Sequence, residues 1–361
     1  MKRSLTQLFI LSLIIIMGAA LFTGCSQADA VVESNPDQGD TKRVSMNLSL
    51  AHFFPATHPA ETLLVQQWAA LIDEVTDGQI TITSYPGQTL LAAPEIYDGV
   101  QSGVADIGLS CFSYTRGRFP LLEAFELPGI VYNNSKVASK VAWEGLKELD
   151  PVEVKDTRLM MVLATGPGDL FTKVPVRTLE DLQGLEIRAT GLSAKTLEAM
   201  GATPVAMPQS DAYEALSRGV VQGNLSPIEV LQGWRHAEVT DYLTMTPFLY
   251  NTLFFVTMNL DVWNSIPDHL QETITVATEE FFNEVAIGLW DEQNDSALEF
   301  AVNETNQEII HLSEEETSRW MEMVMPIQGE FIVEMDALGL DGRAALEIVQ
   351  RHADKYNAVY K

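Results

Sequence analysis

The side chains that most often carry out chemistry in proteins form no catalytic or metal-binding pattern in this sequence. The segment Gly191–Thr196 is superficially similar to a phosphate-binding P-loop, but Ala189 and Ala194 occupy positions that the loop needs as glycine. No Gly-x-Ser-x-Gly nucleophile elbow occurs. None of the six histidines belongs to a His-Glu-x-x-His arrangement; they are His52, His58, His236, His269, His311 and His352. The sequence therefore predicts neither an enzyme, nor a metal site, nor a bound cofactor.

Arg188 is the side chain whose chemistry suggests a ligand contact. A guanidinium offers a planar fork to two carboxylate oxygens and keeps its charge when it is dehydrated. Leu185 and Ile187 alternate with Glu186 and Arg188, and the same alternation also fits an ordinary half-exposed strand. The residues alone leave both interpretations open.

Acidic residues dominate the composition. The chain has 361 residues, 50 of them acidic and 22 basic, and its formal net charge is −28. This excess of negative charge argues against nucleic acid and acidic membrane surfaces as partners, because both require basic patches. An anionic ligand would be repelled overall, so a local cation would have to overcome that field.

The N-terminus resembles a bacterial lipoprotein signal. A basic start, Met1-Lys2-Arg3, precedes the apolar run Leu8–Ala20, and small residues lead to Cys25. We expect residues 1–24 to be removed, Cys25 to be lipidated, and residues 25–43 to form a flexible tether. An ordinary cleaved signal with an incidental cysteine is the alternative. Either way the protein is expected to be periplasmic or extracytoplasmic, and in the first case lipid-anchored to a bacterial membrane.

Hydrophobic spacing alternates between a period of two, typical of strands, and a period near 3.6, typical of helices. In the first half we expect strands at 44–50, from 80 onward, at 104–110 and near 158–164, with helices at 64–75, 94–102 and 135–149. In the second half we expect strands at 185–188, 203–207 and 220–226, with helices at 191–200 and 210–218. Strands joined by single helices predict parallel α/β sheets.

An internal repeat relates the two halves. Residues 97–110 and 213–226 align without a gap, and five of the fourteen positions are identical. Two βαβ units could share this much by chance. The repeat nonetheless predicts two similar α/β lobes whose strand ends, at Ser110 and Ser226, face a shared cleft, because ligands of open α/β sheets bind beyond the carboxyl ends of the strands.

Three helices are expected after these units. No proline follows Pro267 before about Glu304, and one continuous helix over this span would measure on the order of 55 Å. Such a helix is longer than one lobe needs and is expected to bridge both. A capping box over Ser313–Glu316 opens the next helix, and residues 341–358 form the last.

Four ordered segments carry a family resemblance: Ala51–Pro59 (AHFFPATHP), Gly184–Arg188 (GLEIR), Met200–Pro208 (MGATPVAMP) and Ala215–Ser226 (ALSRGVVQGNLS). Together they resemble the DctP-type solute-binding proteins that serve TRAP (tripartite ATP-independent periplasmic) transporters. The resemblance covers essentially the whole chain from 44 to 361.

The resemblance implies an α/β, two-lobe periplasmic-binding-protein fold, with a ligand cleft between the lobes and a long helix spanning both. The expected boundaries are 44–165 plus about 254–293 for lobe I, and 166–253 plus about 294–361 for lobe II. It also implies a receptor that captures a small organic acid and delivers it to the small and large membrane subunits of a TRAP permease. A receptor for an ABC importer or for a sensor kinase is the alternative.

Within the resemblance, Arg188 corresponds to the family arginine that grips the ligand carboxylate. Other positions depart from the sialic-acid and C4-dicarboxylate members: Ser226 stands in place of an asparagine, Cys111 in place of a glutamate, and Asp169 in place of a second arginine. The last exchange argues against a second ligand carboxylate. It leaves open an amine on the ligand, or an Asp169 that points into solvent.

The remaining candidate ligand-binding residues are Gln209, Glu229, Phe54 and Trp234. Phe112 and Tyr114 are further aromatic residues expected near the cleft, although such residues are more often core. The aromatic candidates favour a monocarboxylate with an apolar or aromatic body, 2-oxo acids included.

Overall fold

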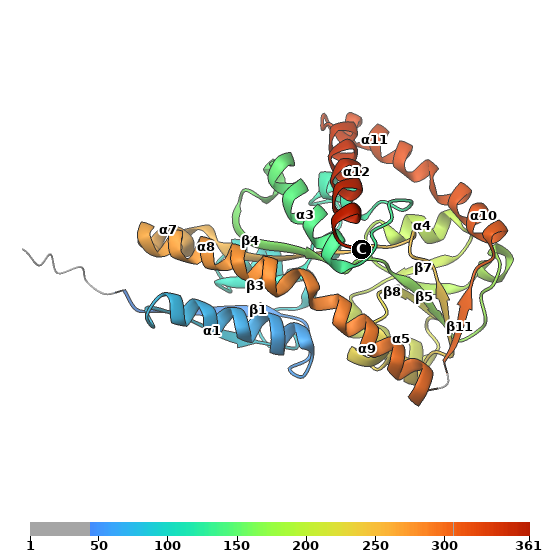
Figure 1. Cartoon of the computed structure of the whole chain (residues 1–361), viewed down its shortest axis with the longest axis horizontal. Coiled ribbons are helices and arrows are strands. Elements are labelled where there is room, and N and C mark those ends of the chain that lie inside the picture. Colours follow the sequence, from blue (N-terminus) through green and yellow to red (C-terminus); the bar gives the residue numbers. More distant parts are fainter. Residues whose placement is uncertain (1–43, 306) are drawn as a thin grey trace, which may run out of the picture. The chain divides into compact units, whose positions relative to one another are not determined.

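The computed structural model describes residues 44–305 and 307–361, which belong to one compact unit (Figure 1). The predicted signal peptide, Cys25 and the tether lie outside the described residues. Over the part that is described, no helix is both long enough and apolar enough to cross a membrane.

The first sheet has five strands in the order β2-β1-β3-β10-β4. Their bounds are Met46–His52 for β1, Ile80–Tyr85 for β2, Ile107–Cys111 for β3, Thr157–Ala164 for β4 and Leu253–Asn259 for β10. β1 runs parallel to β2 and β3, whereas β10 runs antiparallel to β3 and β4. The expected parallel sheet is therefore mixed, because a strand from the second half of the chain enters it between β3 and β4.

The second sheet has six strands in the order β11-β9-β5-β8-β6-β7. Their bounds are Asp169–Thr172 for β5, Glu186–Ala189 for β6, Thr203–Ala206 for β7, Gly223–Ser226 for β8, Tyr242–Met245 for β9 and Glu308–His311 for β11. β6 is parallel to β7 and β8, while β5 is antiparallel to β8 and β9. The chain thus passes from the first sheet to the second between β4 and β5, and returns between β9 and β10.

Helices cover both sheets at most of the predicted places. The first six are α1 (Gln66–Val75), α2 (Ile96–Gln101), α3 (Ser135–Leu149), α4 (Ser193–Ala199), α5 (Gln209–Arg218) and α6 (Val230–Gly233). The remaining six are α7 (Leu260–Ser265), α8 (Asp268–Glu284), α9 (Leu289–Glu304), α10 (Glu314–Val324), α11 (Pro326–Ala337) and α12 (Gly342–Val359). α5 ends at Gly219 in the left-handed conformation (φ 73°), as the glycine stop in the internal repeat predicts.

The predicted long helix is two helices, α8 and α9, separated by a short turn over 285–288 (Figure 1). α8 packs against α1 and β4 beside the first sheet, and α9 packs against α6 beside the second. The pair still spans both sheets. The first turn of α9 still packs on the first sheet, since the Trp290 ring lies 5.2 Å from that of Phe254, whereas Ala297 and Ala301 pack with residues of the second.

The C-terminal helices contact elements of both sheets. α10 packs against α4 and against the short turn η6 (Leu179–Leu182), whereas α12 packs against α3, which covers β4. Residues 314–359 therefore do not all attach to the second sheet. The predicted lobe boundaries stay a prediction.

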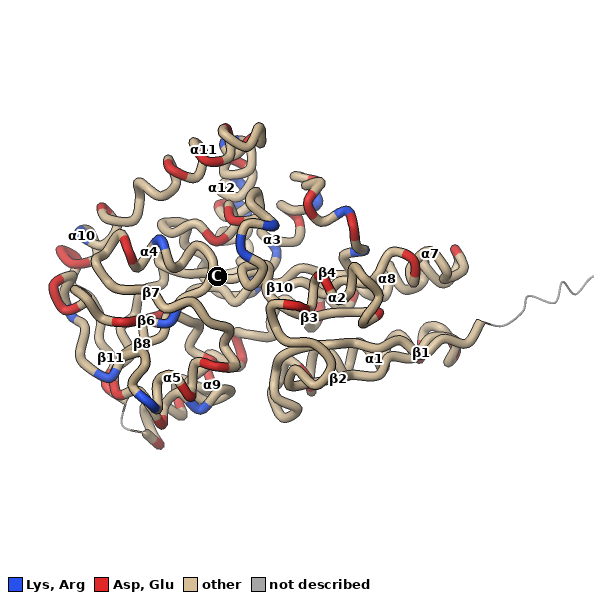
Figure 2. Tube along the Cα trace, turned by 180° about the vertical axis from the view of Figure 1, so that it is seen from behind, with Lys and Arg blue, Asp and Glu red and all other residues tan. Residues whose placement is uncertain are grey.

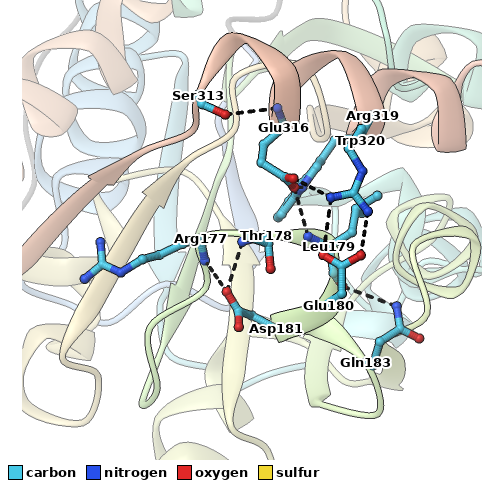
Figure 3. Close-up of polar contacts among 10 residues, drawn as sticks. All are labelled: Arg177, Thr178, Leu179, Glu180, Asp181, Gln183, Ser313, Glu316, Arg319 and Trp320. Carbon is cyan, nitrogen blue, oxygen red and sulfur yellow. Dashed lines mark hydrogen bonds and ion pairs between the residues drawn. The ribbon is translucent and has the colours of Figure 1, made fainter.

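A polar network fastens α10 to the turn that leads into β6 (Figure 3). Ser313 Oγ accepts a hydrogen bond from the Glu316 backbone N–H at 3.1 Å, which is one half of the predicted capping box. The Glu316 carboxylate does not return a bond to the Ser313 N–H, because it accepts from other donors. The Glu316 carboxylate accepts from Leu179 N (3.1 Å) and Trp320 Nε1 (3.2 Å), and it also pairs with Arg319. Glu316 therefore holds the N-terminal end of η6 against α10.

Acidic side chains are distributed over many elements of the molecule. Figure 2 shows Asp and Glu on α5, α9, α10 and α11 among others. A buried cation therefore stands out against the negative charge of the composition.

Candidate functional site

A cavity lies where strand ends of the two sheets meet. The segments after the carboxyl ends of β1, β3 and β4 reach it from the first sheet, and those after β6 and β8 reach it from the second. Its lining is Phe53, Phe54, Cys111, Tyr114, Thr165, Arg188, Thr190, Gln209, Ser226, Pro227, Glu229, Val230, Trp234, Tyr250, Thr252 and Phe254. This is the place at which open α/β sheets bind ligands.

Arg188 lies in β6, and its guanidinium is almost entirely buried, with 1% of the residue exposed. Nε donates to the carbonyl of Met207 at 2.9 Å, and Nη1 donates to Ser226 Oγ at 3.1 Å and to Asn224 Oδ1 at 3.4 Å. All three acceptors are neutral. Among the described residues, no carboxylate lies within ion-pair distance of Arg188, and Nη2 has no hydrogen-bond partner. The sheet thus orients a positive charge that has no counter-ion.

His236 lies behind Arg188 and keeps this part of the site free of a second charge. Its ring nitrogens lie 3.1 Å from the side-chain amides of Gln209 and Asn224. Burial, together with the positive charge of Arg188, lowers the pKa of His236 to about 3, so the ring is neutral. The polar groups that hold Arg188 in place therefore carry no net charge.

The other titratable groups beside Arg188 are also held neutral. Burial raises the pKa of the Cys111 thiol well above its ordinary value. It does the same for the hydroxyls of Tyr114 and Tyr250. Arg188 and Glu229 are consequently the only charged side chains in the lining of the cavity.

Aromatic rings from both sheets close the cavity. Trp234, which follows α6, lies 6.0 Å from Phe53 and 5.9 Å from Phe54 between ring centroids. Phe254 of β10 lies 5.7 Å from Phe54. Side chains of the first sheet therefore pack directly on Trp234 of the second, and they form an apolar wall near the guanidinium.

A buried polar pair crosses between the sheets at the same place. His58 Nε2 lies 3.1 Å from Glu229 Oε2, and both residues are less than 5% exposed. The backbone N–H of Ala60 donates to His58 Nδ1, so that nitrogen accepts. Nε2 therefore carries the proton and donates to Glu229.

Two polar atoms of the cavity lining are buried without a hydrogen-bond partner: Thr190 Oγ1 and Trp234 Nε1. Buried polar groups are normally paired, and an unpaired one costs free energy. Thr190 follows Arg188 by two residues at the end of β6. Seven other described side-chain atoms share this property elsewhere, so these two groups are donors that a ligand in the cavity could pair with.

The structure gathers seven of the eight predicted site residues around this cavity. They are Arg188, Ser226, Gln209, Cys111, Phe54, Glu229 and Trp234. Their contact with a ligand stays a prediction. Tyr114 also lines the cavity, whereas Phe112 lines a neighbouring hollow instead.

Asp169, the eighth predicted site residue, does not line this cavity, and its contact with a ligand stays a prediction. It opens β5 opposite Ser226, but its carboxylate accepts a hydrogen bond from the backbone N–H of Thr246 and borders a separate groove. It is 2% exposed, so it does not point into solvent either. The reason is that β5 also pairs with β9, and the chain after β9 supplies the donor that captures the side chain.

Four hydroxyl-bearing residues of the lining were not predicted, namely Thr165, Thr190, Tyr250 and Thr252, and neither were the apolar Phe53, Pro227, Val230 and Phe254. Thr190 could have been found, because it immediately follows the strand that carries Arg188. Thr165, Tyr250 and Thr252 lie in the two passages between the sheets. No local motif marks them, and only the antiparallel entry of β10 brings them to the cavity.

Comparison with known proteins identifies the family. The model of bacterial extracellular solute-binding proteins, family 7 (DctP), matches residues 50–334, well over half of the chain. The chain belongs to this family. The resemblance seen in the sequence, to the DctP-type receptors of TRAP transporters, is thereby confirmed, as is the two-lobe α/β fold.

Solved structures of DctP-type proteins resemble the chain over most of its length. A TRAP periplasmic solute-binding protein from Desulfovibrio salexigens, in an open complex, is 34% identical, with a TM-score of 0.76 over 88% of this chain and 98% of that one. A marine metagenome TRAP solute-binding protein specific for aromatic acid ligands, solved with 3-hydroxybenzoate, is 28% identical, with a TM-score of 0.82 over 87% and 99%. One from Rhodoferax ferrireducens with copurified benzoate is 25% identical, with a TM-score of 0.81 over 88% and 100%.

Proposed function

We propose that this protein is the extracytoplasmic receptor of a TRAP transporter and that it binds a small monocarboxylate with an apolar or aromatic body. The observation that carries the proposal is Arg188, a buried cation without a counter-ion in an aromatic cavity. Burying an unpaired charge is costly. A ligand carboxylate would supply both the counter-charge and acceptors for Nη2 and for the hydroxyl of Thr190.

Membership of the DctP family and the bound benzoate and 3-hydroxybenzoate of two solved relatives support this class of ligand. The aromatic rings that line the cavity suit an apolar or aromatic body better than a sugar acid with many hydroxyls. The neutral surroundings of Arg188 provide for one carboxylate, and Asp169, which replaces the second family arginine, lies elsewhere. We further propose that the bound acid is passed to the small and large TRAP membrane subunits. Attachment through a lipid on Cys25 is part of the same proposal.

The test is a thermal-shift screen of carboxylic acids followed by titration calorimetry. Binding at a hundredfold excess over Kd should stabilise the native state by roughly 2.7 kcal/mol. Arg188→Ala should weaken binding on the order of a hundredfold, because hydrogen bonds to charged groups contribute about 1.5–3 kcal/mol each. Arg188→Lys should recover only part of this loss, since an ammonium lacks the two-pronged geometry.

Arg343→Ala, which removes an exposed arginine on α12, is the matched control and should bind like the wild type. Circular dichroism should show that all variants are folded. Wild-type affinity in Arg188→Ala would contradict the proposed function.

A further inference from the structure

Glu229 is the second charged group of the cavity, and it faces no cation. The residue is 4% exposed, and within the described part of the chain its carboxylate pairs with His58 alone. The proton of His58 lies on Nε2 while Nδ1 accepts from Ala60 N, so this imidazole is neutral. The other carboxylate oxygen, Oε1, accepts no hydrogen bond from the described residues, and Glu229 lines the cavity.

A glycine in the adjacent backbone leaves space for the His58–Glu229 pair. Gly233, at the end of α6, passes so close that a Cβ would stand 2.6 Å from Glu229 Oε2 and 2.8 Å from His58 Nε2. A side chain at this position would push the two groups apart. Glu229 is thus held at the cavity by the local fold, and it is further anchored by its backbone N–H, which donates to Asn294.

An unsatisfied donor lies beside the same histidine. The Trp234 indole Nε1 is buried and has no acceptor, and the Trp234 ring centroid lies 5.6 Å from that of His58. Trp234 and Glu229 both line the cavity. Beside the His58 ring, the site therefore has an acceptor, the Glu229 carboxylate, and an unpaired donor, the Trp234 N–H. The guanidinium of Arg188 is the third polar group.

A hydroxyl is the group that matches this combination, because it donates one hydrogen bond and accepts others. It can donate to Glu229 and accept from the Trp234 N–H. An ammonium could donate to Glu229 but would leave the indole N–H without an acceptor. A second carboxylate would be repelled by Glu229, and a purely apolar substituent would leave both groups unpaired.

We propose that the ligand is a hydroxy monocarboxylate, whose carboxylate binds Arg188 and whose hydroxyl binds Glu229 and Trp234. This inference rests on the proposed function and narrows it to one class of acid. Sites that hydrogen-bond a substrate hydroxyl discriminate strongly against the analogue that lacks it, because their own buried groups are then left unpaired.

Titration calorimetry with acids that differ by one hydroxyl tests this assignment. The probes are benzoate against its three hydroxybenzoate isomers, and phenylacetate against mandelate. At least one hydroxylated acid should bind ten- to hundredfold more tightly than its parent, as expected for a hydrogen bond to a charged group. Glu229→Gln should reduce this ratio about tenfold or more, and Trp234→Phe, which keeps an aromatic ring and deletes the N–H, about three- to tenfold.

The ratio of the affinity for a hydroxylated acid to that for its parent is the informative quantity. Any general effect of Glu229→Gln on the contact between the sheets changes the affinities for both acids of a pair alike. Glu299→Gln, the same substitution at an exposed position of α9, should leave the ratio unchanged. An absent hydroxyl preference, or one that both cavity variants retain, would overturn the assignment. So would a Glu229-dependent preference for 3-(aminomethyl)benzoate over the hydroxylated acids. If no carboxylic acid binds in an Arg188-dependent way, the proposed function itself fails.

Discussion

Arg188 is dehydrated by the fold before any ligand arrives. Its partners are a carbonyl, a serine hydroxyl and an asparagine amide, and the nearby histidine, thiol and phenols are neutral. Because none of these groups neutralises the guanidinium, its attraction for an anion is preserved while much of its dehydration has already occurred. This arrangement explains how a strongly acidic protein can bind an acid: the long-range field is screened by salt, whereas the buried charge acts at contact distance.

Asp169 is a buried carboxyl group outside the cavity, and its titration makes the stability of the protein depend on pH. Burial raises its pKa from 3.8 to about 7. Between about pH 4 and pH 7 the folded state therefore binds more protons than the unfolded state, and the free energy of unfolding falls as the pH rises through this window. Asp169→Asn keeps an acceptor for the Thr246 N–H and removes the ionisation.

Urea unfolding of Asp169→Asn should give stability close to wild type at pH 4 and higher than wild type at pH 8. The difference in free energy of unfolding between the variant and the wild type should grow by about 1.4 kcal/mol per pH unit between about pH 4 and pH 7. Asp295→Asn, an exposed substitution at the rim of the same groove, controls for the loss of one negative charge. A gap that does not change with pH would show that Asp169 does not titrate as its burial indicates. Ligand affinity should be unchanged, because Asp169 does not line the cavity.

The predictable part of the site consists of residues at the ends of strands. Arg188, Ser226 and Cys111 could be placed from sequence because the strand and its direction also fix where its carboxyl end lies. The position of Asp169 could not be predicted in the same way. Its side chain is captured by a donor near β9, and that pairing joins segments more than seventy residues apart.

At the level of elements, the helices and the parallel βαβ units follow from hydrophobic spacing, whereas the crossing strands do not. β10 is buried along its whole length, so it lacks the alternation that marks a half-buried strand. The break between α8 and α9 is equally invisible in the apolar pattern. It depends on which sheet each half covers, and no local rule specifies that.

Glu316 joins α10 to η6 through the hydrogen bond that it accepts from Leu179 N, and it also accepts from Trp320 Nε1 within α10 (Figure 3). Glu316→Ala should lower the free energy of unfolding by about 1–3 kcal/mol, because the N–H groups of Leu179 and Trp320 lose their acceptor. Glu315→Ala removes an adjacent exposed acid from the same helical turn and should have little effect. Urea unfolding measures both variants. An equal loss in the two would mean that helix charge, rather than the bridge to η6, accounts for the effect.

The chain crosses between the sheets from β4 to β5, from β9 to β10 and again along α8 and α9, and the groups that meet beside the cavity describe a closed cleft. The chain crosses from β4 to β5 through Gly166, whose φ of 75° favours glycine and whose Cβ would stand 2.9 Å from Ser135 N. Beyond these passages, the sheets touch through the His58–Glu229 pair and through the backbone N–H of Gln209, which donates to Tyr114 Oη at 3.0 Å. These contacts can form only when the two sheets lie close together.

A ligand that contacts both sheets should favour this closed arrangement over an open one, because it gains affinity only where both walls are in place. Small-angle X-ray scattering should show a smaller radius of gyration when the tightest-binding acid of the panel saturates the protein.

Tyr114→Phe, which removes the acceptor for Gln209 N and keeps the ring, should weaken binding about three- to tenfold, chiefly through faster release. Tyr213→Phe is the matched control, since the hydroxyl of Tyr213 on α5 bonds to Glu238 in the same half of the molecule. Equal affinities of the two tyrosine variants would show that the Gln209–Tyr114 hydrogen bond does not hold the cleft closed. In the scattering experiment, an unchanged radius of gyration at saturation would show that the cavity binds its ligand without closing.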